Sequence, residues 1–160
     1  MNPVEFSARM PAPFGLVGVR TDGETVAEIV YLPRSAGKLA PRNRIAEEAC
    51  GQIARYLADP DFAFDLRLGP AGTAFQRRVW RLIAAIPCGR TRTYGELAGK
   101  LGSSPRPVGQ ACGANRFPLV IPCHRVVAAA GIGGFAHHDA GFHVAVKRWL
   151  LRHEGVDVAA

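Results

Sequence analysis

The segment Pro122-Cys123-His124-Arg125 holds the residues best suited to chemistry. A cysteine attacks an electrophile only as the thiolate, so a reactive Cys123 needs a base or a positive charge nearby. Adjacent side chains on an extended chain point to opposite sides, so His124 needs a bridging water or a local turn to reach the thiol. The histidine in turn requires an acceptor that orients it, usually a carboxylate. The sequence therefore predicts a nucleophilic cysteine assisted by a histidine and an acid.

The candidates for that acid are the acidic residues that follow Cys123, namely Asp139, Glu154 and Asp157. The remaining cysteines are Cys50, Cys88 and Cys112. They form no C-x-x-C pair, so a thiolate zinc site is not indicated. We expect each of these three to be a buried, inert thiol.

The composition predicts a globular protein with a packed core. Of the 160 residues, 48 % are apolar and 21 % are charged, close to the average for folded domains. The apolar runs are too short to cross a bilayer, and the first residues lack the basic start and apolar centre of a signal peptide. We therefore expect a cytoplasmic protein without a membrane partner.

The first 70 residues have the pattern of a small α/β unit. Residues 14–19 and 26–31 are rich in β-formers and flank a Thr-Asp-Gly turn, which predicts a hairpin. Arg44–Leu57 has helical spacing, with an expected buried stripe of Ile45, Ala49, Ile53 and Leu57. Alternating apolar residues predict a strand over 62–68, and the Gly-Pro-Ala-Gly stretch at 69–72 is the best candidate for a linker.

The second half of the chain is predicted to be mainly helical. Thr73 and Gln76 form a capping-box pattern at the start of one helix, whose expected apolar face is Phe75, Val79, Leu82, Ile83 and Ile86. Thr93 and Glu96 repeat that pattern for a helix over Tyr94–Leu101, which Gly102 ends.

A further helix is predicted from Ser104 to about Gly113, and together with the preceding one it makes a helix-turn-helix pattern. Proline on both sides of an apolar stretch excludes a helix between Asn115 and Val127. The last predicted helix covers Val144–His153, with an apolar face of Val146, Trp149 and Leu150.

Positive charge is concentrated in the second half of the chain. Residues 1–70 hold 8 basic and 9 acidic side chains, a net charge of −1, whereas residues 71–160 hold 12 and 4, a net charge of +8. One-sided basic charge beside a helix-turn-helix pattern favours nucleic-acid binding.

Four stretches together resemble the O6-alkylguanine-DNA alkyltransferases, also called methylated-DNA–protein-cysteine methyltransferases. In order, they are GTAFQRRVWRLIAAIPCGRTRTYGELA, RPVGQACGAN, IPCHRVV and KRWLLRHEG. The resemblance covers about residues 72–155, just over half of the chain. The first 70 residues are compatible with the small α/β domain of that family but carry no motif.

The resemblance implies an α+β fold. A small N-terminal α/β, ribonuclease H-like domain would occupy residues 1–70, and a winged helix-turn-helix-like domain that binds DNA and accepts the alkyl group would occupy residues 71–160. The implied activity is direct DNA repair, a single irreversible transfer from O6-alkylguanine, and possibly O4-alkylthymine, in double-stranded DNA. A monomer without cofactor or metal is implied.

The resemblance also assigns catalytic roles. Cys123 would accept the alkyl group, His124 would act as a base through water, and Glu154 would orient and polarise that histidine. Asn115 would brace the turn that contains the active-site segment.

For the substrate, Tyr94 would donate to the damaged base and help to flip it out of the duplex. Arg106 would fill the gap that the flipped nucleotide leaves, and the backbone of Val126 would accept a hydrogen bond from the guanine amino group. The remaining residues expected to contact substrate or DNA are Gly109, Arg125, Gly134 and Phe135.

This sequence departs from the family pattern at three places. Arg116-Phe117-Pro118 replaces the commoner Asn-Pro after the hinge position. Pro107 follows Arg106, where alanine is usual in the family. A proline is tolerated at this place because it lies in the first turn of a helix. The loop over 131–147 is longer than usual and contains His137, His138 and His143, so substrate range and metal binding at this loop stay open. The alternative functions are a damage sensor that does not react, which in this family lacks the cysteine, and a winged-helix regulator with a structural cysteine.

Overall fold

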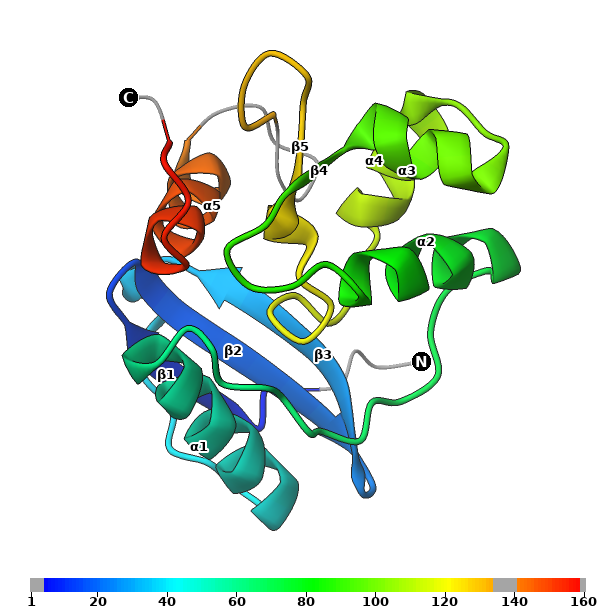
Figure 1. The fold of residues 1–160 in the computed structure, drawn as a ribbon. Coiled ribbons are helices and arrows are strands. Elements are labelled where there is room, and N and C mark those ends of the chain that lie inside the picture. The colour runs from blue at the N-terminus through cyan, green and yellow to red at the C-terminus, as the bar shows by residue number, and fades with distance from the viewer. Residues whose placement is uncertain (1–4, 134–140, 159–160) are drawn as a thin grey trace. The chain divides into compact units, whose positions relative to one another are not determined.

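The computed structural model describes residues 5–133 and 141–158, and the chain divides into two compact units, Met1–Pro70 and Ala71–Ala160. Both helices and strands are present, so the α+β class is confirmed (Figure 1). None of the helices in the described ranges is both long and apolar enough to cross a membrane.

In the first unit, β1 (Ala8–Ala12), β2 (Gly15–Asp22) and β3 (Thr25–Leu32) form an antiparallel sheet in that order. The predicted hairpin is confirmed as the β2–β3 pair, with a register shift at Arg20/Thr21. The sequence did not predict β1. This short strand contains Pro11, which suits the edge of a sheet but weakens the strand signal.

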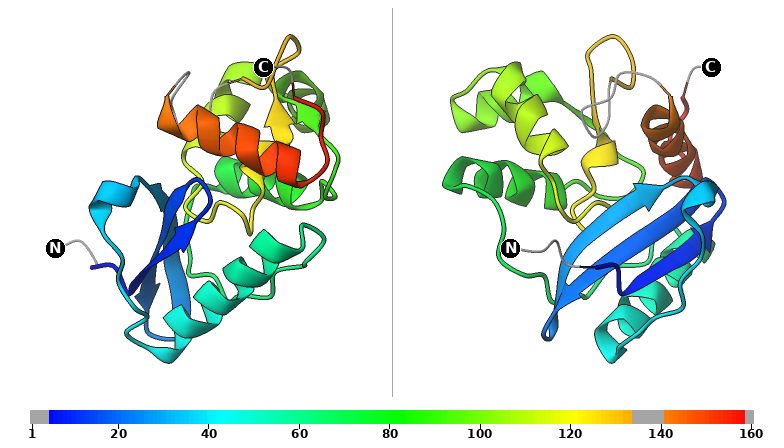
Figure 2. Two further views of the ribbon diagram at one scale, coloured as in Figure 1. Left: turned by 90° about the vertical axis from the view of Figure 1, so that its left-hand side faces the viewer. Right: turned by 180° about the vertical axis from the view of Figure 1, so that it is seen from behind.

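Helix α1 (Arg44–Ala58) packs against the strands and begins at Asn43, whose side chain accepts from the backbone N of Ala46 at 2.8 Å (Figure 2). The expected buried stripe is wrong in part, because Ile45 and Leu57 are partly exposed. The residues that are buried are Ala46, Ala49, Ile53 and Tyr56. Their spacing alternates between three and four, as a helix of 3.6 residues per turn requires, whereas a constant spacing of four drifts off the face.

The predicted strand over 62–68 is also wrong, apart from an isolated bridge between Leu68 and Val26. The backbone of Asp65 instead exchanges two hydrogen bonds with the side chain of Gln52, at 2.8 and 2.9 Å. The ring of Phe64 packs against Tyr56 of α1. The first part of this segment is therefore held on α1, whereas its end is held on β3, where the backbone of Val26 bonds to the oxygen of Arg67 and the nitrogen of Gly69, both at 2.8 Å. A one-turn 3-10 helix, Arg34–Ala36, lies between β3 and α1.

The second unit contains four helices within its described residues. They are α2 (Ala74–Ala84), α3 (Tyr94–Leu101), α4 (Pro105–Gly113) and α5 (Phe142–His153). Both predicted capping boxes are confirmed, at Thr73 and at Thr93. Gly102 ends α3 in the left-handed conformation at φ 62°, a position that favours glycine, and α4 follows after a short turn.

Two apolar faces differ from the prediction. In α2 the buried residues include Trp80, whose ring nitrogen donates to the backbone oxygen of Ala111 at 2.9 Å, while Phe75 and Leu82 stay partly exposed. In α5 Trp149 is partly exposed and stacks on His153, while Lys147 is buried. Tryptophan and lysine both combine an apolar body with a polar end, so their burial depends on whether that end finds a partner.

A parallel pairing of two very short strands joins distant parts of this unit. β4 (Arg92–Thr93) pairs with β5 (Val126–Val127), which follows the one-turn 3-10 helix Cys123–Arg125. Two-residue strands carry no periodicity that a sequence can reveal. The pairing places the start of α3 beside the cysteine segment.

Candidate active site

Asn115 holds together the loop that leads to Cys123. Its side-chain nitrogen donates to the backbone oxygen of Ile121 at 2.8 Å and to the Cys123 Sγ at 3.1 Å. Its side-chain oxygen accepts from the backbone N of Phe117 at 2.9 Å. Within this loop Leu119 has a positive φ of 77°, an unfavourable conformation for a leucine. Three side-chain bonds from one asparagine thus fix a strained loop.

The Cys123 thiol is buried, with 4 % of the residue exposed. A side-chain hydrogen bond with Cys112 and burial raise the pKa of Cys123 well above its usual value. The amide of Asn115 and the charge of Lys147 act in the opposite direction. At rest the thiol is therefore protonated, so a base must take its proton during the reaction.

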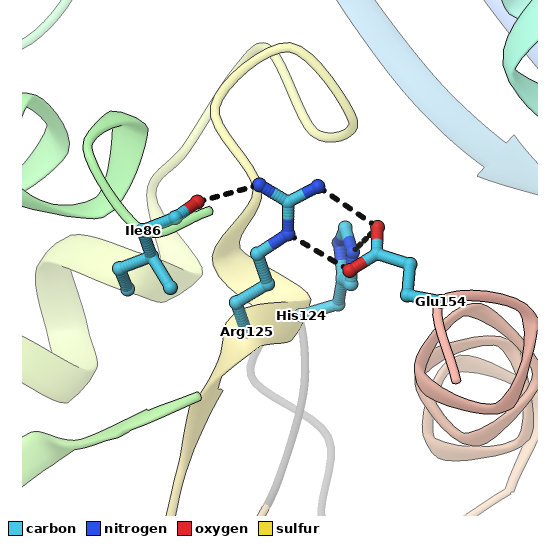
Figure 3. Close-up of polar contacts among 4 residues, drawn as sticks. All are labelled: Ile86, His124, Arg125 and Glu154. Atoms are coloured by element: carbon cyan, nitrogen blue, oxygen red, sulfur yellow. Dashed lines mark hydrogen bonds and ion pairs between the residues drawn. The ribbon is translucent and has the colours of Figure 1, made fainter. Parts of the chain in front are cut away.

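His124 and Glu154 form a buried pair (Figure 3). The His124 Nε2 lies 2.7 Å from a carboxylate oxygen of Glu154, and both side chains are almost wholly excluded from solvent. Glu154 follows the last residue of α5, and α5 packs against the Cys123–Arg125 turn (Figure 2). Of the three candidate acids, the structure therefore brings Glu154 to the histidine, whereas Asp157 is exposed and Asp139 lies outside the described residues.

Arg125 completes this pair on the other side of the carboxylate. Its guanidinium donates to both oxygens of Glu154, at 2.8 and 3.0 Å, and to the backbone oxygen of Ile86 at 2.6 Å (Figure 3). The Arg125 side chain is 13 % exposed. Its guanidinium is thus hydrogen-bonded to other residues of the second unit. The family resemblance had implied a contact of Arg125 with substrate or DNA.

The His124 ring is suited to accept a proton. Burial lowers its pKa, against the opposing pull of Glu154, so the ring is neutral at pH 7. Because Nε2 donates to the carboxylate, the lone pair lies on Nδ1. That atom is buried and has no hydrogen-bond partner among the described residues. A water molecule between Nδ1 and the thiol would relay the proton of Cys123 to the histidine.

Tyr94 is the first residue of α3, directly after β4. Burial, followed by the Cys112 and Cys123 thiols, raises the pKa of its hydroxyl, which stays protonated and able to donate. Gly133 allows its segment to approach the ring closely, because a Cβ at this position would lie 3.3 Å from a ring carbon of Tyr94. A Cβ at Gly109 would lie at an ordinary contact distance of 4.0 Å from the ring.

The other expected contact residues lie at separate places. Arg106 is exposed near the start of α4, and Pro107 follows it without breaking that helix. The backbone oxygen of Val126 accepts from the Lys147 side chain at 2.7 Å. Gly134 and Phe135 lie outside the described residues, as do His137 and His138. In the parts that the structure describes, no three His, Cys, Asp or Glu side chains cluster as a metal site.

Sequence reasoning missed Lys147 and Cys112. Cys112 was expected to be a buried, inert thiol, but it is partly exposed and its side chain is hydrogen-bonded to that of Cys123. Lys147 is fully buried in α5. A signal for this burial was present in the sequence. Lys147 lies one residue after Val146 and three before Leu150, on the apolar side of a predicted helix.

The second unit is similar to a known family of DNA-repair domains. The family model described as 6-O-methylguanine DNA methyltransferase, DNA binding domain, matches residues 74–156. That range includes all of the helices of the second unit and every residue of the site just described.

Individual relatives extend the similarity. A methylated-DNA–protein-cysteine methyltransferase of Methanosarcina acetivorans is 41 % identical over 111 residues, covering 68 % of each chain. The crystal structure of Mycobacterium tuberculosis O6-methylguanine methyltransferase matches with a TM-score of 0.78 and 30 % identity, over 98 % of this chain and 97 % of that one. A structure of the M. tuberculosis OGT in complex with DNA matches with a TM-score of 0.75 and 32 % identity, over 92 % and 91 % of the two chains.

Proposed function

The chain belongs to the 6-O-methylguanine DNA methyltransferase family, and we propose that it repairs DNA by moving an alkyl group from O6 of guanine to Sγ of Cys123. The activity is that of a methylated-DNA–protein-cysteine methyltransferase. One observation carries the assignment of residues: His124, the residue after Cys123, is paired with the buried Glu154 through Nε2, so that the lone pair of the histidine lies on Nδ1.

The reaction follows from this arrangement. The thiol proton passes through water to the His124 Nδ1, and the imidazolium that forms is stabilised by Glu154. The Sγ–C bond forms as the C–O6 bond breaks, and the electron pair of that bond passes to the guanine. The hydroxyl of Tyr94 donates to the base as this negative charge develops. The product is a thioether, which water does not readily cleave, so each molecule acts once.

Access to the alkyl group requires the nucleotide to leave the duplex. The O6 atom of a paired guanine cannot reach a buried thiol, so the base must rotate into the protein. Arg106, which is exposed in the first turn of α4, would fill the vacated stack. The amino group of the flipped guanine would bond to the backbone oxygen of Val126. The positive charge of residues 71–160 supplies sequence-independent affinity for phosphates.

We further propose the finer fold assignments. The α3–α4 pair beside the β4–β5 ladder supports a winged helix-turn-helix-like domain over 71–160. The antiparallel sheet covered by α1 supports a ribonuclease H-like domain over 1–70. Because each chain carries its own acceptor and base, a monomer in the cytoplasm suffices for the reaction.

Replacement of the acceptor tests the proposal. Cys123→Ser should abolish transfer from a duplex that contains O6-methylguanine and leave binding to that duplex nearly unchanged, because an alcohol is a far poorer nucleophile of similar shape. Mass spectrometry of the intact protein should show a gain of one methylene for the parent chain and for a Cys50→Ser control, and no gain for Cys123→Ser.

Other outcomes point to other functions. Selective binding to the damaged duplex without a mass gain in the parent chain indicates a sensor. Binding without any preference for damage indicates a regulator. A methyl group that maps to Cys88 or Cys112 contradicts the assignment of Cys123.

A further inference from the structure

Cys112 and Cys123 are two thiols in contact, of which the proposed reaction uses one. The side chain of Cys112 is hydrogen-bonded to that of Cys123. Tyr94 and Lys147 each interact electrostatically with both thiols, so the two sulfur atoms face the same small region of the second unit. Thiols that lie this close can react with each other as well as with a substrate.

The fold holds the two thiols together through Asn115. Cys112 lies in the last turn of α4, and its backbone oxygen accepts from the backbone N of Asn115 at 3.2 Å. The side-chain nitrogen of the same asparagine donates to the Cys123 Sγ at 3.1 Å. Trp80 holds this end of α4 as well, because its ring nitrogen donates to the backbone oxygen of Ala111 at 2.9 Å. The contact between the thiols is therefore a built part of the site.

The two thiols differ in their access to solvent. Cys112 is partly exposed, whereas only 4 % of Cys123 is exposed. The Cys112 hydrogen bond and burial also raise the pKa of Cys123, which keeps its thiol protonated. A protonated thiol reacts slowly with peroxides, because the thiolate is the nucleophile. A dissolved oxidant is therefore expected to react first with Cys112.

We propose that Cys112 and Cys123 form a reversible disulfide when the protein meets a small peroxide, and that this disulfide blocks the acceptor sulfur until a reducing thiol restores it. The formation of the disulfide concerns the two thiols alone. Its effect on alkyl transfer rests on the proposed function.

The oxidation balances in two steps. Hydrogen peroxide transfers one oxygen atom to the Cys112 sulfur as its O–O bond breaks, which converts the thiol to a sulfenic acid and releases water. The Cys123 sulfur then attacks the Cys112 sulfur, the S–S bond forms, and the hydroxyl group leaves with the Cys123 proton as a second water. Both thiols are oxidised and the peroxide is reduced. A small dithiol reverses the linkage by thiol–disulfide exchange.

Such a linkage would protect the acceptor as well as inhibit it. Further oxidation of a sulfenic acid gives sulfinic and sulfonic acids, which thiols do not reduce. A molecule that acts through one acceptor sulfur would be lost by that route, whereas a disulfide can be recovered. The sulfur atoms must approach to about 2.0 Å to form the bond, and this approach starts from a contact that already exists.

The test treats the whole, fully reduced chain with hydrogen peroxide and then with dithiothreitol. Trypsin cleaves after Arg116, between the two cysteines, so a linked pair of peptides reports a disulfide between Cys112 and Cys123. We expect these linked peptides and a loss of two hydrogen atoms from the intact mass after peroxide. Single-turnover transfer from a duplex with O6-methylguanine should fall roughly tenfold or more and return after dithiothreitol.

Two variants make the test specific. Cys112→Ser removes the partner thiol and keeps a small polar side chain, so after the same dose it should form no linked peptides and keep most of its own untreated transfer rate. Cys112→Ala, without the hydroxyl, is expected to behave in the same way. Cys88→Ser is the matched control, because Cys88 is also a partly exposed thiol of the second unit, and it should lose and regain transfer like the parent chain.

The outcomes separate the two proposals. A parent chain that loses transfer without forming the linked peptides overturns the inference, as does a Cys112→Ser chain whose transfer is lost and recovered like that of the parent. A parent chain that transfers no alkyl group before treatment overturns the proposed function, and the linked peptides then still decide whether the two thiols form a disulfide.

Discussion

At the scale of single residues, the most consequential feature is how Glu154 divides its charge. Its carboxylate accepts hydrogen bonds from Nε and Nη2 of Arg125 and from Nε2 of His124. Burial is the main cause that lowers the pKa of His124; Glu154 opposes it, and the charges of Arg125 and Lys147 lower the pKa further. The histidine is therefore neutral at rest, and the carboxylate stays in place to stabilise the imidazolium during transfer.

Glu154→Gln tests this account at the same scale. The amide keeps the size but removes the charge, so we expect transfer to slow by about 10²-fold, with partial recovery as rising pH produces the thiolate directly. The variant should also lose about 1–3 kcal/mol of unfolding free energy, because Arg125 keeps a single neutral acceptor there. Single-turnover kinetics over a pH series and chemical denaturation measure the two effects.

Asp157→Asn is the control for Glu154→Gln, because Asp157 is exposed three residues further along the chain. It should react and unfold like the parent chain. A Glu154→Gln variant that is folded and reacts at the parent rate at neutral pH would remove Glu154 from the relay.

At the scale of elements, the residues that stabilise the start of α3 lie next to Tyr94 of the candidate site. Thr93 belongs to β4, pairs with Val127, and also caps α3 through its side chain, which accepts from the backbone N of Glu96 at 3.0 Å. Tyr94 follows at the next position. Ser104 has an equivalent place before α4 but makes no such bond, because the third residue of that helix is Pro107, which has no N–H to donate.

This contrast gives a matched pair of variants. Thr93→Ala should lower the unfolding free energy by about 1 kcal/mol, because it removes a capping bond, whereas Ser104→Ala should change it by only a few tenths. Chemical denaturation of both variants measures the difference. Equal losses would show that the capping bond of Thr93 contributes nothing net.

At the scale of the whole molecule, the uneven distribution of charge along the chain allows binding to DNA and the transfer reaction to respond differently to salt. Residues 71–160 carry a net charge of +8 and residues 1–70 a net charge of −1, so phosphate contacts are expected from the second unit. Such contacts release counterions and weaken as salt rises, whereas the buried relay is shielded from solvent ions.

We therefore expect salt to act on one substrate and not on the other. Between about 50 and 200 mM salt, affinity for the duplex should fall more than tenfold, while the rate of transfer from the free alkylguanine base should change little. Binding titrations and single-turnover rates at matched salt concentrations measure both. A similar loss on the free base would mean that salt disturbs the site itself.

The sequence by itself determined what depends on local pattern. Helix starts at Thr73 and Thr93 follow from side chains bonding to backbone three residues away, and the β2–β3 hairpin follows from a turn between β-rich runs. The two helices α3 and α4 and the short turn between them could also be predicted, because their start and end signals lie within a few neighbouring residues.

The tertiary structure decided what depends on contacts between distant residues. It selected Glu154 rather than Asp157 as the partner of His124, 30 residues away, turned Arg125 toward that carboxylate, and enclosed Lys147 beside the acceptor thiol. It also decided that the first part of 62–68 packs on α1 and that only its end bonds to the sheet. Burial and charge pairing are set by which segments fold against one another, so no local pattern could reveal which polar group ends inside and with which partner.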